Sequence, residues 1–402
     1  MIPLYIAEKE DKTKGDGITM NKKSSIYFDN GSTSYPKAPG VAREVGRLLT
    51  EGAFNINRGN YEGAYEVADT VLETREQLAD LFHAESSRQV IFTPGITHSL
   101  NYFIRGFLKS GDHVLVTGME HNAVMRPLYA MEKRGVCYEA VYTDEEGNVS
   151  LEDMEHKIRP NTKAIIVLHA SNVCGTIVPV EEIGKICRER QIYFVVDTAQ
   201  SAGTIPVDMK KTGIDFLAFT GHKGLLGPQG IGGFLISSSL DDKMEPLIMG
   251  GTGSQSDSLK MPETLPDKYE SGTLNLPGII GLHAALSYIK EQGIEKIHQK
   301  KMDLTKYFLE QVKQFPQIRI AGKKGTEGRV AVVSLAFLKT DNAVAAFKLE
   351  QKYGIMTRVG LHCAPAAHYI LGTYPQGTVR FAFSTFNTKK EIDQCIQAFK
   401  EL

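Results

Sequence analysis

The chain has 402 residues, and its 46 Lys and Arg against 47 Asp and Glu give a net charge of −1 with neutral histidines. This balance excludes a general polyanion binder, so we expect no nucleic acid among its partners. Hydrophobic residues make up 42% and charged residues 23%, which is typical of folded soluble proteins. No apolar run reaches the roughly 18 residues of a membrane-spanning helix, so we expect no membrane partner either.

Chain length and cysteine content set the broad organisation. A chain of this length predicts about two to three domains. Residues 1–23 are polar and rich in lysine after a short apolar start, and we expect a flexible N-terminal extension there. The five cysteines form an odd set without a CxxC pair, which indicates neither a disulfide framework nor a zinc site. We therefore expect no bound metal and a cytoplasmic location.

Seven short runs of strand-forming residues follow one another, most of them separated by helix-like stretches. Strands that alternate with helices predict an α/β fold with a mostly parallel sheet. The predicted strands are Gln89–Phe92, His113–Val116, Tyr138–Tyr142, Ala164–His169, Tyr193–Asp197, Asp215–Phe219 and Gly232–Ile236.

Apolar residues at helical spacing predict the helices and a second domain. Over 64–82 and 180–190 they indicate amphipathic helices that cover the sheet. After Pro277 the pattern changes. The predicted elements there are helices over 279–292 and 294–314, a strand over 329–337 and a helix over 342–353. We predict a large domain at 24–275, whose first part could pack with the second domain, and a smaller α+β domain at 276–402.

A lysine follows one predicted strand in a glycine-rich stretch. Lys223 has Thr220 and His222 close beside it. This setting suits an amine that forms a Schiff base next to a phosphate, because glycines let the backbone come close. Thr220 and His222 can donate hydrogen bonds to an oxyanion. From these residues alone, a glycine-rich turn with a solvated lysine is the alternative.

A carboxylate ends the predicted strand Tyr193–Asp197. An acid at the carboxyl end of a parallel strand lies on the ligand-binding edge of an open sheet. Asp197 there could keep a pyridine nitrogen protonated, and Gln200 could reach the phenolic oxygen of the same ring. For Asp197 by itself a helix N-cap is the alternative, but its combination with Lys223 favours a cofactor site.

With Asp197 and Lys223 in this order, the chain resembles the class V aminotransferase branch of the fold type I enzymes, which use pyridoxal 5′-phosphate. Within that branch it resembles the cysteine desulfurase and selenocysteine lyase family, from Ile26 onward. The resemblance implies an α/β fold with a large, mostly parallel seven-stranded sheet and a smaller α+β C-terminal domain. It also implies pyridoxal 5′-phosphate as the cofactor and a homodimer.

Two motifs resemble the phosphate-binding segments of this family. The first places Gly95, Ile96 and Thr97 at the cofactor phosphate, with the Thr97 hydroxyl near a helix N-terminus. The family commonly has threonine at the position of Ile96, which is therefore a departure. The second motif implies that Gly272 and Thr273 serve the phosphate bound by the neighbouring subunit.

Other motifs resemble the segments that contact the cofactor ring and the substrate. His121 corresponds to the histidine that stacks on the ring, and Asn172 to the asparagine that touches the cofactor oxygen and the substrate carboxylate. Arg380 corresponds to the carboxylate-binding arginine, for which a planar fork is suited. Asn57 stands on the substrate side, where the family commonly has histidine. Taken singly, His121 and Arg380 could be a surface histidine and a surface ion pair.

One of the five cysteines is predicted to be a nucleophile. A cysteine is usually a small buried hydrophobe, and we expect this of the other four. Cys363 differs because Arg358 and His362 would supply positive potential and Gly360 a flexible loop, which lowers the pKa of a thiol. The segment resembles the short Arg-x-Gly-x-x-Cys-Ala loop of the group II desulfurases, and Arg358 is expected near the substrate.

The resemblance also implies a reaction. Lys223 takes the Cα proton of the substrate, and the Cys363 thiolate attacks Sγ, which yields L-alanine and a persulfide on Cys363. The substrate would be L-cysteine or L-selenocysteine, and a sulfur-acceptor protein would be a further partner. The alternatives are an aminotransferase, C–S lyase or epimerase of the same branch, or a non-catalytic sulfur-transfer scaffold.

Overall fold

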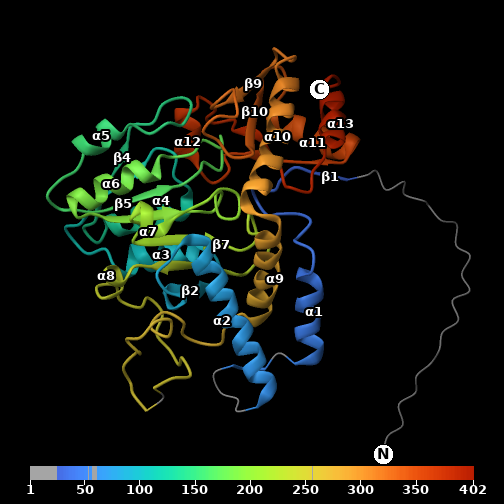
Figure 1. Cartoon of the computed structure of the whole chain (residues 1–402). Coiled ribbons are helices and arrows are strands. Elements are labelled where there is room, and N and C mark those ends of the chain that lie inside the picture. Colours follow the sequence, from blue (N-terminus) through green and yellow to red (C-terminus); the bar gives the residue numbers. More distant parts are fainter. Residues whose placement is uncertain (1–24, 53, 57–60, 256) are drawn as a thin grey trace, which may run out of the picture.

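The computed structural model describes residues 25–52, 54–56, 61–255 and 257–402 (Figure 1). The strands of its largest sheet are β2 (Val90–Thr93), β3 (His113–Thr117), β4 (Cys137–Val141), β5 (Thr162–Leu168), β6 (Tyr193–Asp197), β7 (Phe216–Thr220) and β8 (Gly232–Ile236). They lie in the order β2-β8-β7-β6-β5-β3-β4. β8 runs antiparallel to both of its neighbours, and the other pairs are parallel. All seven predicted strands are confirmed.

Both faces of this sheet are buried, which explains its apolar strands. Along β5, Ile165 and Val167 belong to one core cluster, whereas Ala164 and Ile166 belong to the other. Successive side chains of a strand point to opposite faces, so a sheet covered on both sides needs nearly continuous apolar strands.

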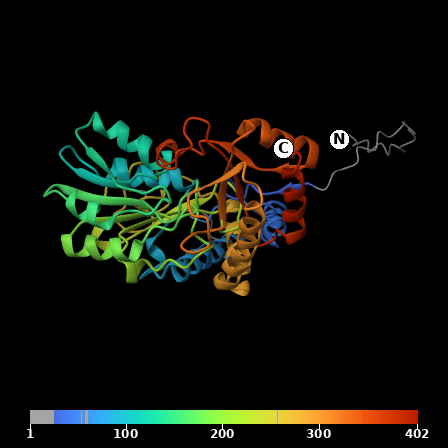
Figure 2. The same ribbon diagram turned by 90° about the horizontal axis from the view of Figure 1, so that it is seen from above.

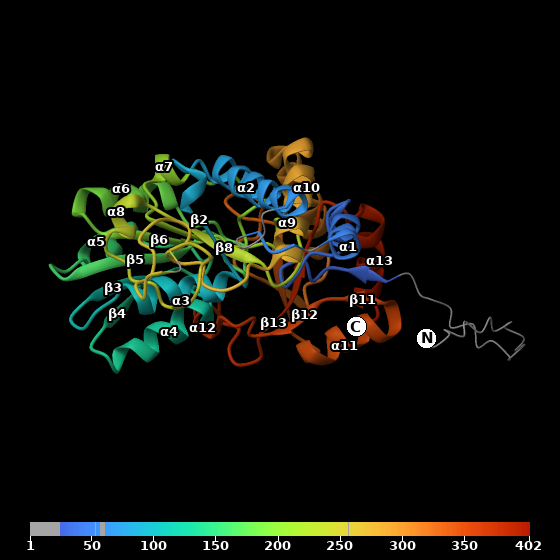
Figure 3. The same ribbon diagram turned by 90° about the horizontal axis from the view of Figure 1, so that it is seen from below.

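Helices form the layers on the two faces. Figure 3 shows α2, α6 and α7 on one side of the sheet, and α3 and α4 on the other. The helices before and within this unit are α1 (Val41–Glu51), α2 (Glu62–Phe82), α3 (Ile96–Gly106), α4 (Asn122–Glu132), α5 (Leu151–His156), α6 (Val180–Arg190), α7 (Met209–Thr212) and α8 (Ser238–Asp241), with a 3-10 turn at Ser87–Gln89. The amphipathic helices predicted over 64–82 and 180–190 correspond to α2 and α6.

A smaller unit follows along the chain and lies beside one end of the large sheet (Figure 2). Its antiparallel sheet has the order β12-β13-β10-β9. The elements along this part of the chain are α9 (Leu276–Gln292), α10 (Ile294–Val312), β9 (Ile318–Ala321), β10 (Val332–Phe337), α11 (Asn342–Tyr353), β12 (Arg358–Gly360), α12 (Pro365–Ile370), β13 (Thr378–Ala382) and α13 (Lys389–Phe399). Of these, α9 packs against α1 and α2 and shares the core of the large unit. The predicted α/β fold with a smaller α+β unit is thus confirmed.

The first described residues connect the two units. β1 (Ile26–Tyr27) pairs in parallel with β11 (Ile355–Met356) of the smaller unit. Further along, the Ser34 amide donates to the His222 carbonyl at 2.8 Å, next to Lys223. We call residues 26–34 the N-terminal strap. The predicted extension at 1–23 lies outside the described residues.

In the described part of the chain, no helix combines the length and the apolar character needed to cross a membrane.

Candidate active site

Most of the predicted cofactor residues lie at one edge of the large sheet. Parallel strands bring their carboxyl ends to the same edge, where open α/β sheets bind ligands. The residues there are Gly95 after β2, His121 after β3, Asn172 after β5, Asp197 at the end of β6, and Lys223 after β7.

Asp197 and Lys223 are the central charged pair. The Asp197 side chain is buried, and its Oδ1 accepts a hydrogen bond from the Ala199 amide at 2.8 Å. Burial raises the pKa of Asp197, although the Ala199 amide and the charge of Lys223 oppose this. Burial also lowers the pKa of Lys223 to about 8, and the charge of Asp197 opposes that shift. A lysine with such a pKa has a substantial neutral fraction near pH 8, as a nucleophilic amine requires.

The predicted phosphate loop meets the strand that precedes Lys223. A Cβ atom on Gly95 would lie 3.8 Å from Thr220 Oγ1, so these two segments converge. Ile96 is the first residue of α3, and its side chain is buried in the core. At this departure from the family pattern, the chain offers a backbone amide instead of a hydroxyl. Thr97, the next residue, is exposed. The free amides of a helix N-terminus suit a phosphate group.

His121 caps the N-terminus of α4. Its Nδ1 accepts a hydrogen bond from the Ala123 amide at 3.0 Å, so the proton of the neutral ring is assigned to Nε2. Burial lowers the pKa of His121 to about 4, and the charges of Lys223 and Arg380 add to this shift. A neutral imidazole with a fixed tautomer can stack on an aromatic ring and present one N–H donor.

Glu120, the buried neighbour of His121, was not among the predicted site residues. Its Oε1 accepts hydrogen bonds from Thr117 Oγ1 at 2.7 Å and from the Leu168 amide at 3.0 Å. Burial raises the pKa of Glu120 to about 8, and the charge of Asp197 adds to this. Glu120 therefore ties the turn that carries His121 to β5. Its position next to a predicted site residue was the only signal in the sequence.

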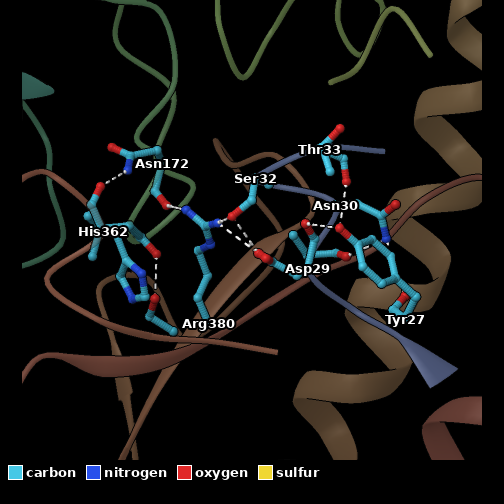
Figure 4. Close-up of polar contacts among 12 residues, drawn as sticks. Tyr27, Asp29, Asn30, Ser32, Thr33, Asn172, His362 and Arg380 are labelled. Carbon is cyan, nitrogen blue, oxygen red and sulfur yellow. Dashed lines mark hydrogen bonds and ion pairs between the residues drawn. The ribbon is translucent and has the colours of Figure 1, made fainter. Parts of the chain in front are cut away.

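Arg380 lies on β13 and is buried between Asn172 and the N-terminal strap (Figure 4). Its Nη1 donates to the Asn172 carbonyl at 3.0 Å, and its Nη2 donates to Asp29 Oδ1 at 3.0 Å and to Ser32 Oγ at 2.7 Å. Asp29 and Ser32 were not predicted as site residues from the sequence. They are 351 and 348 positions from Arg380 along the chain, and no spacing pattern links them to it.

Arg358 lies directly opposite Arg380 in the register of β12 and β13. Opposite residues of an antiparallel pair project to the same face, so both guanidinium groups belong to one side of the smaller sheet. Arg358 is exposed, whereas Arg380 is buried. Its place beside Arg380 is compatible with the substrate role predicted for it.

Cys363 lies in the short loop between β12 and α12, and its side chain is exposed. The Cys363 carbonyl accepts a hydrogen bond from the Asn122 amide at 2.8 Å, and Asn172 Nδ2 donates to the His362 carbonyl at 2.7 Å. These bonds fix the loop of the smaller unit against the sheet edge. Cys363 is also close enough to interact electrostatically with Lys223 and Arg380.

The prediction that His362 supplies positive charge beside the thiol is wrong. Its ring is buried, and its Nε2 lies 3.0 Å from Thr378 Oγ1 in a hydrogen bond. Burial lowers the pKa of His362 to about 2, so the ring is neutral at physiological pH. The basic groups that interact electrostatically with Cys363 are Lys223 and the buried Arg380.

Gln200 and His222 support the N-terminal strap. Gln200 Nε2 donates a hydrogen bond to the Gly31 carbonyl at 3.0 Å, and the Gln200 Oε1 atom takes no part in this bond. The His222 carbonyl accepts from Ser34 and from Lys37 Nζ, the latter at 3.1 Å. Burial lowers the pKa of His222 to about 4, so its ring is neutral. Both residues thus lie at the sheet edge and also hold the N-terminal strap, through Gly31 and Ser34.

The structure does not bring Gly272 and Thr273 to the edge that carries Lys223. Both are exposed, and they line a small recess with Gly253. This segment is anchored by the preceding residue Glu270, which forms a buried ion pair with Arg75. Asn57, the other predicted substrate residue, lies outside the described residues.

The residues at the sheet edge fit pyridoxal 5′-phosphate. Several polar atoms there are buried and have no hydrogen-bond partner within the described residues, and three of them belong to predicted site residues. They are Asn172 Oδ1, His222 Nδ1 and Arg380 Nε. The edge also offers a buried carboxylate for a pyridine nitrogen, an amine for an aldehyde and helix amides for a phosphate. These are the partners that the cofactor requires.

Comparisons with known proteins identify the family. The family model described as aminotransferase class-V matches residues 26–395, so the chain belongs to this family. Similar proteins within it are cysteine desulfurases. A protein of Pyrococcus abyssi named "probable cysteine desulfurase" is 35% identical over 384 residues, which cover 94% of each chain. A protein of Yersinia pseudotuberculosis named "cysteine desulfurase" is 29% identical and covers 95% of this chain and 94% of its own.

Solved structures agree with this assignment. The apo structure of a cysteine desulfurase from Thermococcus onnurineus superimposes with a TM-score of 0.88 at 33% identity, covering 94% of both chains. The cysteine desulfurase CsdA of Escherichia coli, in an S-sulfonic acid form, gives a TM-score of 0.85 at 26% identity and also covers 94% of both chains. The chain therefore has the fold type I architecture expected from its motifs.

Proposed function

We propose that the protein is a pyridoxal 5′-phosphate-dependent cysteine desulfurase, which converts L-cysteine to L-alanine and leaves a persulfide on Cys363. The observation that carries the proposal is the position of Cys363. An exposed thiol lies on a short loop that is hydrogen-bonded to the sheet edge, and its charge interacts with Lys223 and Arg380. An exposed thiol held at the sheet edge with Lys223 and Arg380 is placed to act as a nucleophile.

Residues of this chain would hold the cofactor as follows. Lys223 offers its amine to the aldehyde, Asp197 its carboxylate to the pyridine nitrogen, and His121 its ring face. The α3 N-terminus at Gly95 and the Thr220 hydroxyl offer donors to the phosphate. When bound, pyridoxal 5′-phosphate supplies an electron sink for negative charge at the substrate Cα.

The chain's own groups perform the proton and sulfur transfers. Lys223 Nζ accepts the Cα proton, which its low pKa allows near pH 8. The Cys363 thiolate attacks the substrate Sγ, so that an S–S bond forms while the Cβ–Sγ bond breaks and its electron pair stays with carbon. Two protons, at Cα and Cβ, complete L-alanine. The Nε2–H of His121 is a fixed donor on this side of the site.

The short Cys loop has a consequence for sulfur delivery. Cys363 is tied through its carbonyl to Asn122 and through the neighbouring His362 carbonyl to Asn172, so the persulfide stays near the sheet edge. A sulfur-acceptor protein would therefore have to reach the exposed thiol in place.

We further propose that L-selenocysteine is an alternative substrate and that the active unit is a homodimer. We also propose that the enzyme is cytoplasmic, because all five cysteines are free.

The test is incubation of the purified holoenzyme with L-cysteine and, separately, with L-selenocysteine. The proposal expects L-alanine from L-cysteine, together with a protein-bound persulfide or, with a reductant present, sulfide. Pyruvate in place of alanine would indicate a C–S lyase, and amino-group transfer to an added keto acid would indicate an aminotransferase. Either result would contradict the proposal.

A further inference from the structure

Arg380 already forms an ion pair with a carboxylate of its own chain, that of Asp29. Besides the two bonds from its Nη2 to Asp29 and Ser32, Ser32 Oγ donates to Asp29 Oδ1 at 2.7 Å, which closes a triangle of three polar groups (Figure 4). The side chains of Arg380 and Asp29 are only 4% and 17% exposed. The ion pair is therefore shielded from solvent and from salt.

The strap fixes Asp29 on both sides. The amide of Ala382, the last residue of β13, donates to the Phe28 carbonyl at 2.7 Å. The Tyr27 hydroxyl donates to the carbonyls of Asp29 and Thr33 at 3.1 and 2.9 Å. The carboxylate is thus held at the arginine by the backbone on which it stands.

Gly31 brings the same strap against the guanidinium group. A Cβ atom at this position would lie 3.0 Å from Arg380 Cζ and 3.1 Å from its Nε, which is tighter than most Cβ contacts in proteins. The arginine therefore has little room to move away from Asp29 and Ser32 on this side.

The N–H donors of Arg380 are already partly used, which limits how an incoming carboxylate can bind. A guanidinium group binds a carboxylate with two parallel hydrogen bonds along either of two edges, Nε with Nη2 or Nη1 with Nη2. Nη2 belongs to both edges, and its two hydrogens point to Asp29 and Ser32. Nε is free, and Nη1 has one bond, to Asn172. A two-point contact therefore requires an exchange at Nη2.

We propose that Asp29 and Ser32 are specificity-determining residues that occupy Arg380 as an internal carboxylate site, with which the substrate carboxylate must exchange. This inference rests on the proposed function, in which Arg380 binds that carboxylate. Because the charge of Asp29 offsets that of Arg380, a simple carboxylic acid gains little from the site. A ligand must add contacts through its amino group and side chain, so the pair selects α-amino acids over acids without an amine.

A purely structural role predicts the opposite response to mutation. If Asp29 and Ser32 only positioned Arg380, their loss would displace the arginine and weaken the binding of every carboxylate. If they compete with the ligand, their loss makes Nη2 available and strengthens the binding of simple carboxylates. The sign of the change separates the two roles.

The experiment measures propionate binding to the holoenzyme by isothermal titration calorimetry. Asp29→Asn keeps the shape but removes the charge, and propionate is expected to bind about fivefold tighter than to the wild type. Ser32→Ala frees one Nη2 hydrogen and is expected to give a smaller change of the same sign. Tyr27→Phe is the matched control, because it loosens the strap but leaves both acceptors of Nη2 in place, and its affinity should not change.

Unchanged or weaker propionate binding in the folded variants would overturn the inference, with folding checked by circular dichroism and by the visible absorption of the cofactor. If Asp29→Asn does not fold, the Ser32→Ala variant provides the test: tighter propionate binding supports the inference, and unchanged or weaker binding overturns it. Arg380→Gln should abolish the binding, and retained binding would also overturn the inference. Propionate is not turned over, so a failure of the proposed function would be seen separately, as absent alanine formation from L-cysteine.

Discussion

At the scale of single residues, the pKa of Lys223 determines when the cofactor can bind. Reaction with an aldehyde needs the neutral amine, and burial lowers the pKa of Lys223 from 10.5 to about 8. Below this pKa the amine is protonated and unreactive, and above it the amine is neutral. We expect the rate at which cofactor-free protein takes up pyridoxal 5′-phosphate to rise with pH and to level off above a midpoint of about 8. Stopped-flow absorption measures this rate.

Asp197→Asn is the comparison variant for this prediction. The charge of Asp197 holds the pKa of Lys223 up, so its removal should move the midpoint to lower pH. Lys223→Ala should show no uptake band at any pH. A midpoint near that of a solvent-exposed lysine would contradict the environment described for Lys223.

The thiol of Cys363 decides between desulfuration and other chemistry on the same cofactor. Cys363→Ser leaves Asp197 and Lys223 intact, so the visible absorption of the cofactor should be retained. Persulfide formation from L-cysteine should fall by several orders of magnitude, because a covalent nucleophile has been removed, roughly 10³-fold or more. Alanine release and persulfide labelling measure the loss.

Cys174→Ser is the control, because Cys174 is buried outside the Cys loop. Its alanine formation should stay near that of the wild type once folding is confirmed. The Cys363→Ser substitution should lower the turnover of L-selenocysteine less than that of L-cysteine, because selenium leaves more readily. If Cys363→Ser produced alanine from L-cysteine at the wild-type rate, the thiol would not be the nucleophile.

Motif order alone was enough to select Gly95, His121, Asn172, Asp197 and Lys223, which the structure brings to one sheet edge because each lies at or just after the end of a strand. The same reasoning could not find Asp29, whose contact with Arg380 spans 351 positions. It was also wrong about His362, because burial decides whether a histidine is charged and the sequence does not show burial at a loop position.

At the scale of elements, one buried ion pair ties α2 to the segment before Thr273. Arg75 donates to Glu270 at 2.9 and 2.6 Å, and the Phe92 amide of β2 donates to the same carboxylate at 2.6 Å. Removing one partner of a buried pair leaves the other charge uncompensated, which costs about 3–5 kcal/mol. We expect Glu270→Ala to lower the free energy of unfolding by this amount, measured by urea denaturation of the cofactor-free protein.

Glu181→Ala provides the matched comparison. Glu181 pairs with Lys211 at 3.0 Å, but both side chains are more than half exposed, so the loss of this pair should leave the free energy of unfolding unchanged. Equal effects of the two substitutions would show that Glu270 does not anchor the segment.

At the scale of the whole molecule, local patterns predicted the elements better than their assembly. The helix predicted over 342–353 coincides with α11, which is capped by the Asp341 side chain at its start and ended by Gly354 in the left-handed conformation. The pairing of β1 with β11 was beyond such reasoning. Each of these strands has two residues, which is too short for any periodicity, and they are joined only by tertiary contact.

The assembly of two chains is the remaining question at this scale. Thr273 is exposed and lies away from the edge with Lys223, as expected if its hydroxyl serves the phosphate of a partner subunit. In that case each site takes Lys223 from one chain and Thr273 from the other, so Lys223→Ala and Thr273→Ala remove residues that different chains contribute. A hybrid dimer of the two variants would then contain one site with both an intact Lys223 and an intact Thr273 from the other chain.

Hybrid dimers can be made by co-expression of the two variants with different affinity tags. We expect them to bind about one cofactor per dimer with wild-type affinity, whereas Lys223→Ala dimers bind none and Thr273→Ala dimers bind weakly. The expectation follows if a two-fold axis pairs each Lys223 with the Thr273 of the other chain. Absorption titration measures the stoichiometry and affinity. If Thr273 served its own subunit, each hybrid site would lack one residue, and no wild-type site would be recovered.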